Sequence, residues 1–320
     1  MIEDVWYDDF LEALSKMYPK RVKLVQDLVE LLKIEPESVY RRLRKEVYFT
    51  SHEMAKMVSE WNMSFDEIAG ITPKKIPFKI QTFNHPEVSQ RETEFMQQIK
   101  HTLHFLQKSP NAEYLEVCNR LPCPFYANFA YLNQYYMFRW LHQYSHPSNI
   151  IPFSQAAFSW ENIQLSNKYC HAMKQIPKTD FILDDLLFEH LVNDILYFQS
   201  VRMITDEEKE LLKNNLYCLL DYLAKIAHTG YYPETKKKVT LYILQINIDT
   251  NYCYICDDNT RITFIHLFDK FETQGFNSET FLRYKTWLQL MKRYSSKISE
   301  VDEKRRFEFF RDQRQCVDRL

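Results

Sequence analysis

The sequence predicts a mostly α-helical protein: an N-terminal unit of five short helices, followed by a large helical unit that contains a small three-stranded antiparallel sheet. Apolar residues recur at helical spacing along most of the chain. Signals for helix starts crowd the first 70 residues, whereas β-branched and aromatic residues alternate with turn residues only in 239–267. The chain has only three glycines, which excludes glycine-rich phosphate-binding loops.

Residues 21–45 are predicted to form two short helices with a tight turn between them. Leucines recur along 22–32 at the spacing of one helix face, and Ile34 follows as an apolar side chain in the turn. Pro36 suits the first position of a second helix, where a missing N–H costs nothing. Val39 and Leu43 are four residues apart and are expected to point inward.

The second helix carries a basic face opposite its apolar one. The expected stripe consists of Ser38, Arg41, Arg42 and Lys45, with Tyr40 and Arg44 beside it. Arg41 or Arg42 could make bidentate contacts to guanine. Phosphate contacts are expected from Lys20, Arg21, Lys23, Arg44 and Lys45. Residues 20–45 hold eight Lys or Arg and four Asp or Glu, a local net charge of +4 in a chain of −2.

Three further helices complete the predicted N-terminal unit. One covers residues 7–17, and two begin at the capping boxes Thr50–Glu53 and Ser64–Glu67. We therefore expect a domain over residues 1–72, a proline-containing linker over 73–86, and a second domain over 87–320.

The elements expected in the second domain follow the same rules. Helices are predicted over 87–109, 127–144, 154–173, 179–202, 206–228, 277–297 and 301–317. The helix at 206–228 begins at the capping box Thr205–Glu208. Strands are predicted over 239–248, 252–256 and 262–267, paired in sequence order as an antiparallel meander.

Composition limits the class of protein. Hydrophobic residues make up 45% of the chain, enough for a packed core. No apolar run is long enough to span a membrane, and the acidic N-terminus lacks the basic start of a secretory signal, so we expect a soluble cytoplasmic protein. An odd number of cysteines, seven, favours reduced thiols over a disulfide framework.

The sequence indicates no catalytic residues, metal site or cofactor. Cys253 and Cys256 form a CxxC, but residues three apart on a strand face opposite sides and cannot share a metal. Cys118 and Cys123 are separated by Pro122, and the helical pair His101 and His104 has no further ligand beside it.

The segment SVYRRL, residues 38–43, resembles the start of recognition helices in the lambda-repressor-like helix-turn-helix families. The run from Ile298 to Phe310 and the aromatic segment at 124–143 are similar to large bacterial regulators that join such a domain to a long helical region. In that group the C-terminal run has a glycine where this chain has Asp302. The resemblance implies a transcription regulator.

We therefore expect a sequence-specific DNA-binding regulator that acts as a homodimer, with a C-terminal region for dimerisation or for sensing an unknown effector. A dimer doubles the contacts that one recognition helix can make. The alternative is a protein-interaction or scaffold module without DNA binding, and a third possibility is an enzyme housed in the C-terminal region. Double-stranded DNA is the expected partner, with no membrane involved.

Overall fold

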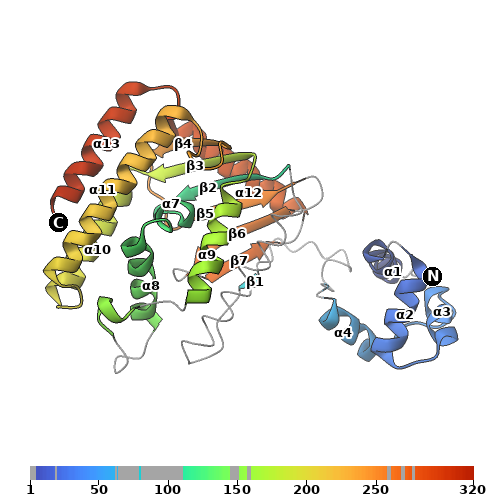
Figure 1. Ribbon diagram of the computed structural model, residues 1–320. Coiled ribbons are helices and arrows are strands. Elements are labelled where there is room, and N and C mark those ends of the chain that lie inside the picture. Colours follow the sequence, from blue (N-terminus) through green and yellow to red (C-terminus); the bar gives the residue numbers. More distant parts are fainter. Residues whose placement is uncertain are drawn as a thin grey trace. The chain divides into compact units, whose positions relative to one another are not determined.

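The computed structural model of the 320-residue chain divides into two compact units, Met1–Pro77 and Phe78–Leu320 (Figure 1). The structure describes residues 5–18, 20–61, 63, 79–80, 111–144, 151–156, 160–257, 261–267, 271–275 and 278–320. The helix predicted at 87–109 and the capping box at Ser64–Glu67 lie outside the described residues.

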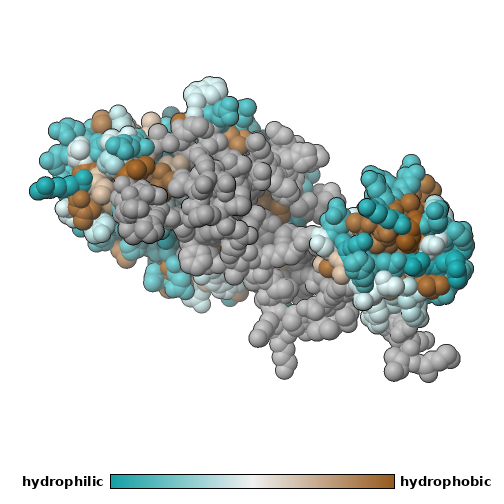
Figure 2. All heavy atoms as spheres, turned by 90° about the horizontal axis from the view of Figure 1, so that it is seen from below, coloured by the Kyte–Doolittle hydropathy of each residue, from teal (hydrophilic) through white to brown (hydrophobic). Residues whose placement is uncertain are grey.

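The N-terminal unit is a cluster of short amphipathic helices around one small core. Its described helices are α1 (Val5–Met17), α2 (Arg21–Leu32), α3 (Pro36–Leu43) and α4 (Ser51–Glu60). Each helix contributes apolar side chains to the core, among them Phe10, Leu14, Leu28, Val39 and Met57. The outward positions are mostly polar, and Figure 2 shows hydrophilic residues over most of the visible surface of this unit.

The start of α4 confirms the capping box predicted at Thr50. The Thr50 hydroxyl accepts a hydrogen bond from the backbone N–H of Glu53, and the Glu53 carboxylate accepts one from the backbone N–H of Thr50. Just before this cap, the N–H of Phe49 donates to the hydroxyl of the buried Tyr7 at 3.1 Å. These bonds fix the chain that joins α3 to α4 against α1.

The second unit is built on one mixed eight-stranded sheet with the strand order β1-β7-β6-β5-β2-β3-β4-β8. The strands are β1 (Lys79–Ile80), β2 (Glu113–Cys118), β3 (Lys178–Asp184), β4 (Lys238–Leu244), β5 (Tyr252–Cys256), β6 (Arg261–Leu267), β7 (Phe271–Gly275) and β8 (Ser295–Lys297). The central strands β2, β3 and β4 are parallel, and the flanking pairs are antiparallel. β1 falls within the segment 73–86 that the sequence suggested as a linker.

Helices cover both faces of this sheet (Figure 1). The crossover from β2 to β3 contains α7 (Cys123–Tyr126), α8 (Ala130–Tyr144), a 3-10 turn (Phe153–Gln155) and α9 (Trp160–Met173). The crossover from β3 to β4 contains α10 (Leu187–Ser200) and α11 (Asp206–Thr229). These helices and the C-terminal α13 (Glu303–Asp318) share one large core with the sheet, whereas α12 (Ser278–Met291) packs on the opposite face.

This three-layer α/β architecture shows that the predicted fold class, a mostly helical unit with a three-stranded antiparallel sheet, is wrong. The predicted strands exist close to their expected positions, but β4 does not pair with β5. Instead β4 lies between β3 and β8, because a parallel pair is joined through a helical crossover that leaves no local signal of which strand is the partner.

The helix predicted over 179–202 is also wrong in its first part, where residues 178–184 form the buried strand β3. Phe181, Ile182 and Leu183 are all fully buried, because both faces of β3 are covered by helices. A strand buried on both faces reads as a continuous apolar run and loses the alternation that marks a half-buried strand. The C-terminal part of the helix predicted at 277–297 is similarly replaced by a 3-10 turn (Lys292–Tyr294) and β8.

The helix predicted over 206–228 is confirmed at both ends, whereas those predicted over 127–144 and 154–173 begin later, at Ala130 and Trp160. The capping box at Thr205 starts α11, and Gly230 closes it in the left-handed conformation, with its N–H bonded to the carbonyl of Ile226. Asp302 takes a left-handed φ of 50°, a conformation that glycine adopts at lower cost. Its carboxylate then caps α13 by accepting the N–H of Arg305 at 3.1 Å.

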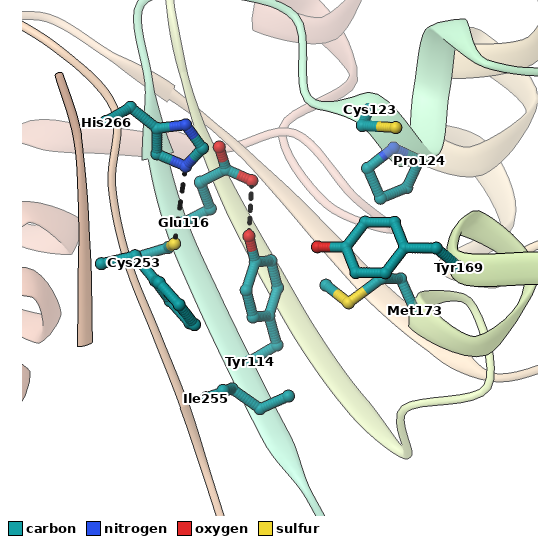
Figure 3. A pocket seen from close by; sticks show the side chains of 10 residues that line it. Tyr114, Glu116, Cys123, Pro124, Tyr169, Met173, Cys253, Ile255 and His266 are labelled. Carbon is teal, nitrogen blue, oxygen red and sulfur yellow. Dashed lines mark hydrogen bonds between the residues drawn. The ribbon is translucent and has the colours of Figure 1, made fainter. Parts of the chain in front are cut away.

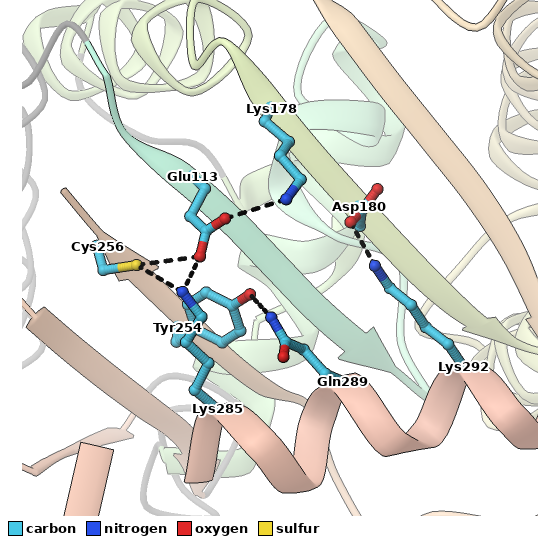
Figure 4. Close-up of polar contacts among 8 residues, drawn as sticks. All are labelled: Glu113, Lys178, Asp180, Tyr254, Cys256, Lys285, Gln289 and Lys292. Carbon is cyan, nitrogen blue, oxygen red and sulfur yellow. Dashed lines mark hydrogen bonds and ion pairs between the residues drawn. The ribbon is translucent and has the colours of Figure 1, made fainter. Parts of the chain in front are cut away.

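Polar contacts attach α12 to the sheet (Figure 4). Lys285 of α12 contacts Glu113 of β2, which also pairs with Lys178 of β3 at 3.2 Å. Burial alone would raise the pKa of Glu113, but the two ammonium groups outweigh it and hold that pKa at about 2. At the far end of α12, the adjoining Lys292 pairs with Asp180 of β3 at 2.6 Å.

Candidate functional site

The candidate site in the N-terminal unit is the surface formed by α2, the three-residue connection 33–35 and α3. α2 buries one apolar face through Leu24, Val25, Leu28 and Leu32. It ends at Lys33, which takes the left-handed conformation at φ 55° and donates its N–H to the carbonyl of Val29 at 2.9 Å. Glycine adopts this conformation at lower cost, so a lysine here shows that the surrounding structure imposes the tight turn.

α3 is a short helix that is anchored on one side only. Pro36 occupies its first turn as predicted, and Val39 is fully buried in the core of the unit. Leu43 and Tyr40 pack against the same core and are partly buried. Ser38 is half-buried and Arg41 is exposed, so the outer face of the helix presents a hydroxyl and a guanidinium.

Arg42 does not belong to the exposed face. Its guanidinium makes two hydrogen bonds to the carboxylate of Glu53, at 2.9 and 3.2 Å, and a third to the carbonyl of Ser38 at 3.0 Å. Only 16% of its side chain is exposed, and the guanidinium lies over the ring of Phe49. Arg42 therefore connects α3 to the start of α4, and three of its N–H groups are already bonded within the unit.

Arg41 and Arg44 remain accessible, with about half of each side chain exposed. Arg41 is 3.4 Å from Glu46, and Arg44 contacts Glu37 at 2.7 Å and Glu46 at 2.8 Å. Exposed ion pairs of this kind contribute little to stability, because water and salt screen them. A phosphate or a base edge can therefore replace these carboxylates at little cost.

Lys45 does not lie on the stripe predicted from helical spacing. α3 ends at Leu43, and Lys45 follows in a left-handed turn with φ 64°. Its ammonium contacts Asp8 of α1. Because the helix ends two residues before Lys45, helical spacing does not place Lys45 beside Arg41.

The remaining predicted phosphate contacts lie at the start of α2. Lys20, Arg21 and Lys23 are exposed, and no described residue forms an ion pair with them. Over residues 5–61, however, ten Lys or Arg are balanced by ten Asp or Glu. Residues 5–61 as a whole are therefore neutral, and the basic side chains of α2 and α3 are balanced by acidic ones.

A second group of candidate functional side chains, which no sequence pattern indicated, lies in the C-terminal unit. A small cavity of about 60 Å³ lies between the sheet and helices α7 and α9 (Figure 3). Glu116 of β2 and His266 of β6 face it, with Tyr114, Cys253 and Tyr169 around them. The Glu116 carboxylate accepts hydrogen bonds from the Tyr114 hydroxyl and from Asn251 Nδ2, both at 2.8 Å.

Burial perturbs both ionisable groups of this cavity. Glu116 is almost fully buried, which raises its pKa to about 7 although the hydrogen bonds from Tyr114 and Asn251 oppose the change. Burial, together with the nearby Arg120, lowers the pKa of His266 to about 4. Near neutral pH the cavity thus holds a half-ionised carboxyl group beside a neutral imidazole.

The polar contacts around Glu116 also have a structural role. Asn251, which donates to Glu116, accepts the backbone N–H groups of Asn119 and Arg120 at 3.0 and 3.1 Å. These bonds hold the chain as it leaves β2. The CxxC behaves as predicted for a strand, since Cys253 faces this cavity while Cys256 lies in the core beneath α12.

In the part of the chain that the structure describes, no group of three or more His, Cys, Asp or Glu is arranged to hold a metal ion. None of the described helices combines the length and the apolar character needed to cross a membrane. Comparison of the chain with models of protein families, with known proteins and with solved structures finds no match.

Proposed function

We propose that the N-terminal unit binds double-stranded DNA through α3, and that the chain is a transcription regulator of the lambda-repressor-like helix-turn-helix type. The observation that carries the proposal is the pair α2 and α3, joined by three residues through the left-handed Lys33. This turn leaves α3 anchored by Val39 with Arg41 outward, the arrangement that a recognition helix needs to enter a major groove.

The proposed DNA contacts of this surface fall into two groups, base contacts and phosphate contacts. Arg41, on the outer face of α3, is the side chain suited to a bidentate contact with a guanine. Lys20, Arg21 and Lys23 at the start of α2 suit the phosphate backbone, since the first helix of such a pair crosses it. Arg44, just past the end of α3, can release Glu37 and Glu46 in exchange for a phosphate.

Arg42 has a different part in this proposal from the base contact expected from the sequence. Its three hydrogen bonds connect α3 to α4 and fix the angle at which Arg41 is presented. It is a positioning residue, and the base contact is assigned to Arg41 alone.

We further propose that two copies bind together in the cytoplasm. One α3, eight residues long, covers few base pairs, and two-fold pairing would double its contacts and fix the spacing of half-sites. The C-terminal unit would supply the dimer contact or the response to an effector.

Selection of bound duplexes from a random pool by the full-length protein tests the proposal. We expect an enriched motif, and an affinity for it that falls steeply between 50 and 200 mM salt, because released counterions oppose binding. Lys23→Ala should weaken binding to enriched and random duplexes alike and reduce the salt slope by about one. Lys304→Ala, an exposed lysine on α13, is the matched control and should change neither.

The alternative of a protein-interaction module is favoured by one observation, the zero net charge of residues 5–61. It predicts no enriched motif from the pool and no loss of duplex affinity on Lys23→Ala. If no motif is enriched, or if Lys23→Ala binds duplexes as tightly as the wild type at every salt concentration, the proposal of DNA binding is overturned and the alternative is supported.

A further inference from the structure

Two cysteines from different helices meet at the edge of the cavity in the C-terminal unit. The sulfur of Cys123, the first residue of α7, is 3.0 Å from the sulfur of Cys170 on α9. The Cys170 thiol is also 3.7 Å from the backbone carbonyl of Cys123. A disulfide bond is about 2 Å long, so the two sulfurs need to approach by only about 1 Å to form one.

The surroundings of the two sulfurs differ. Cys170 is fully buried, with 1% of its surface exposed, whereas Cys123 is half-buried and lines the cavity of about 60 Å³. The hydrogen bond to Cys123, followed by burial, raises the pKa of Cys170 well above its ordinary value. Cys170 therefore keeps its proton, and Cys123 is the cysteine of the pair that lines the cavity and that a small molecule there would meet first.

We propose that Cys123 and Cys170 form an oxidation site for hydrogen peroxide or a comparably small hydroperoxide, with Cys123 as the attacking thiol and Cys170 as the resolving one. A cavity of this volume has room for a molecule of a few non-hydrogen atoms, which fits a peroxide. This inference concerns the C-terminal unit and does not depend on DNA binding.

The reaction proceeds in two balanced steps. The Cys123 thiolate attacks one peroxide oxygen; an S–O bond forms, the O–O bond breaks, and the leaving hydroxide takes a proton to become water. The Cys170 sulfur then attacks the Cys123 sulfur; an S–S bond forms, the S–O bond breaks, and the hydroxyl leaves as water with the proton of Cys170. The two thiols lose two hydrogens, and the peroxide is reduced to two waters.

The new bond would join α7 to α9, which both line the cavity. Pro124 follows Cys123 in α7, and Tyr169 precedes Cys170 in α9; both side chains lie in the cavity wall beside Glu116 (Figure 3). Oxidation would thus fix one wall of the cavity and change the space in front of the carboxyl group.

Peptide mapping of the full-length protein tests the inference. The reduced protein is treated with a small excess of hydrogen peroxide, alkylated and digested without reductant. We expect a cross-linked peptide pair that contains Cys123 and Cys170 and has lost two hydrogens, while the exposed Cys218 on α11 is still alkylated. Preferential oxidation of Cys218, or full alkylation of both Cys123 and Cys170, would overturn the proposal without any variant being needed.

Serine variants test the order of the two steps. Cys170→Ser should stop at a Cys123 sulfenic acid that dimedone labels once the treated protein is unfolded, whereas Cys123→Ser should leave Cys170 as an unmodified thiol. The matched control Cys218→Ser should form the same cross-link as the wild type at the same rate. Dimedone labelling of Cys170 in the Cys123→Ser protein would contradict the assigned order.

Discussion

Glu53 stabilises the N-terminal unit in two separable ways, and substituting it tests the account of Arg42 as a positioning residue. Its carboxylate completes the capping box of α4 and also pairs with the guanidinium of Arg42. Loss of a cap costs about 1 kcal/mol. Removing one partner of a fully buried ion pair costs 3–5 kcal/mol; with both ends of this pair partly reached by water, about 2 kcal/mol is expected.

Glu53→Ala should therefore lower the free energy of unfolding of the N-terminal unit by about 3 kcal/mol. Glu53→Gln keeps a side chain that fits the capping box but removes the charge, so its cost should be about 2 kcal/mol. Thr50→Ala removes only the hydroxyl of the cap and should cost about 1 kcal/mol. The predicted order of destabilisation separates the ion pair from the cap.

The free energies can be measured on the full-length chain by hydrogen exchange in increasing urea, read from peptides that cover residues 36–60. Peptides from α11 in the C-terminal unit are the internal control and should not change. If Glu53→Gln proves as stable as the wild type, the Arg42 pair contributes nothing and the positioning role fails.

The pH dependence of the same pair has a definite sign. Burial alone would raise the pKa of Glu53, but the hydrogen bond from the Thr50 N–H and the Arg42 guanidinium together lower it below its ordinary value of 4.5. The stability from the pair is thus present above pH 4.5 and is lost as the pH falls through the lower folded value. The difference in the free energy of unfolding between wild type and Glu53→Gln should therefore become smaller as the pH falls below 4.5.

Two further predictions concern the turn after α2 and the buried carboxyl group. Lys33→Gly should stabilise the N-terminal unit by roughly 0.5–1 kcal/mol in urea unfolding, because it removes the Cβ from a residue in the left-handed conformation. Lys33→Ala keeps the Cβ and should give no such gain. An equal gain in both variants would refute the reasoning. Glu116 has its pKa raised to about 7, so its stabilising effect is present below pH 4.5 and lost as the pH rises to 7. Compared with Glu116→Gln, the wild type should lose about 3 kcal/mol over that interval, and parallel pH profiles would contradict this.

The N-terminal helices could be predicted because their signals are local. Each combines an apolar face with a start or stop residue in its own sequence, as at Pro36 and Thr50. The central sheet could not be predicted in the same way. β3 is covered on both faces, and its apolar run continues into the leucines of α10 at a spacing that also fits one long helix.

The same holds for the candidate sites: features set by neighbouring residues could be predicted, and contacts between distant residues could not. Helical spacing correctly gave Arg41 an outward position, but nothing near Arg42 in the sequence indicates that Glu53 is its partner. Glu116 and His266, or Cys123 and Cys170, come together only because the sheet order and the crossovers bring them there. Contacts between residues so far apart in the sequence cannot be predicted from their spacing.

The proposal of DNA binding rests most directly on Arg41, and one measurement tests it. The affinity of wild type and Arg41→Ala is compared by fluorescence anisotropy on an enriched duplex and on duplexes with single G·C pairs replaced. We expect Arg41→Ala to lose roughly 1–3 kcal/mol on the enriched duplex, and to become indifferent to one particular G·C pair. Equal affinities of both proteins for every duplex would contradict the assignment of α3 as the reading helix.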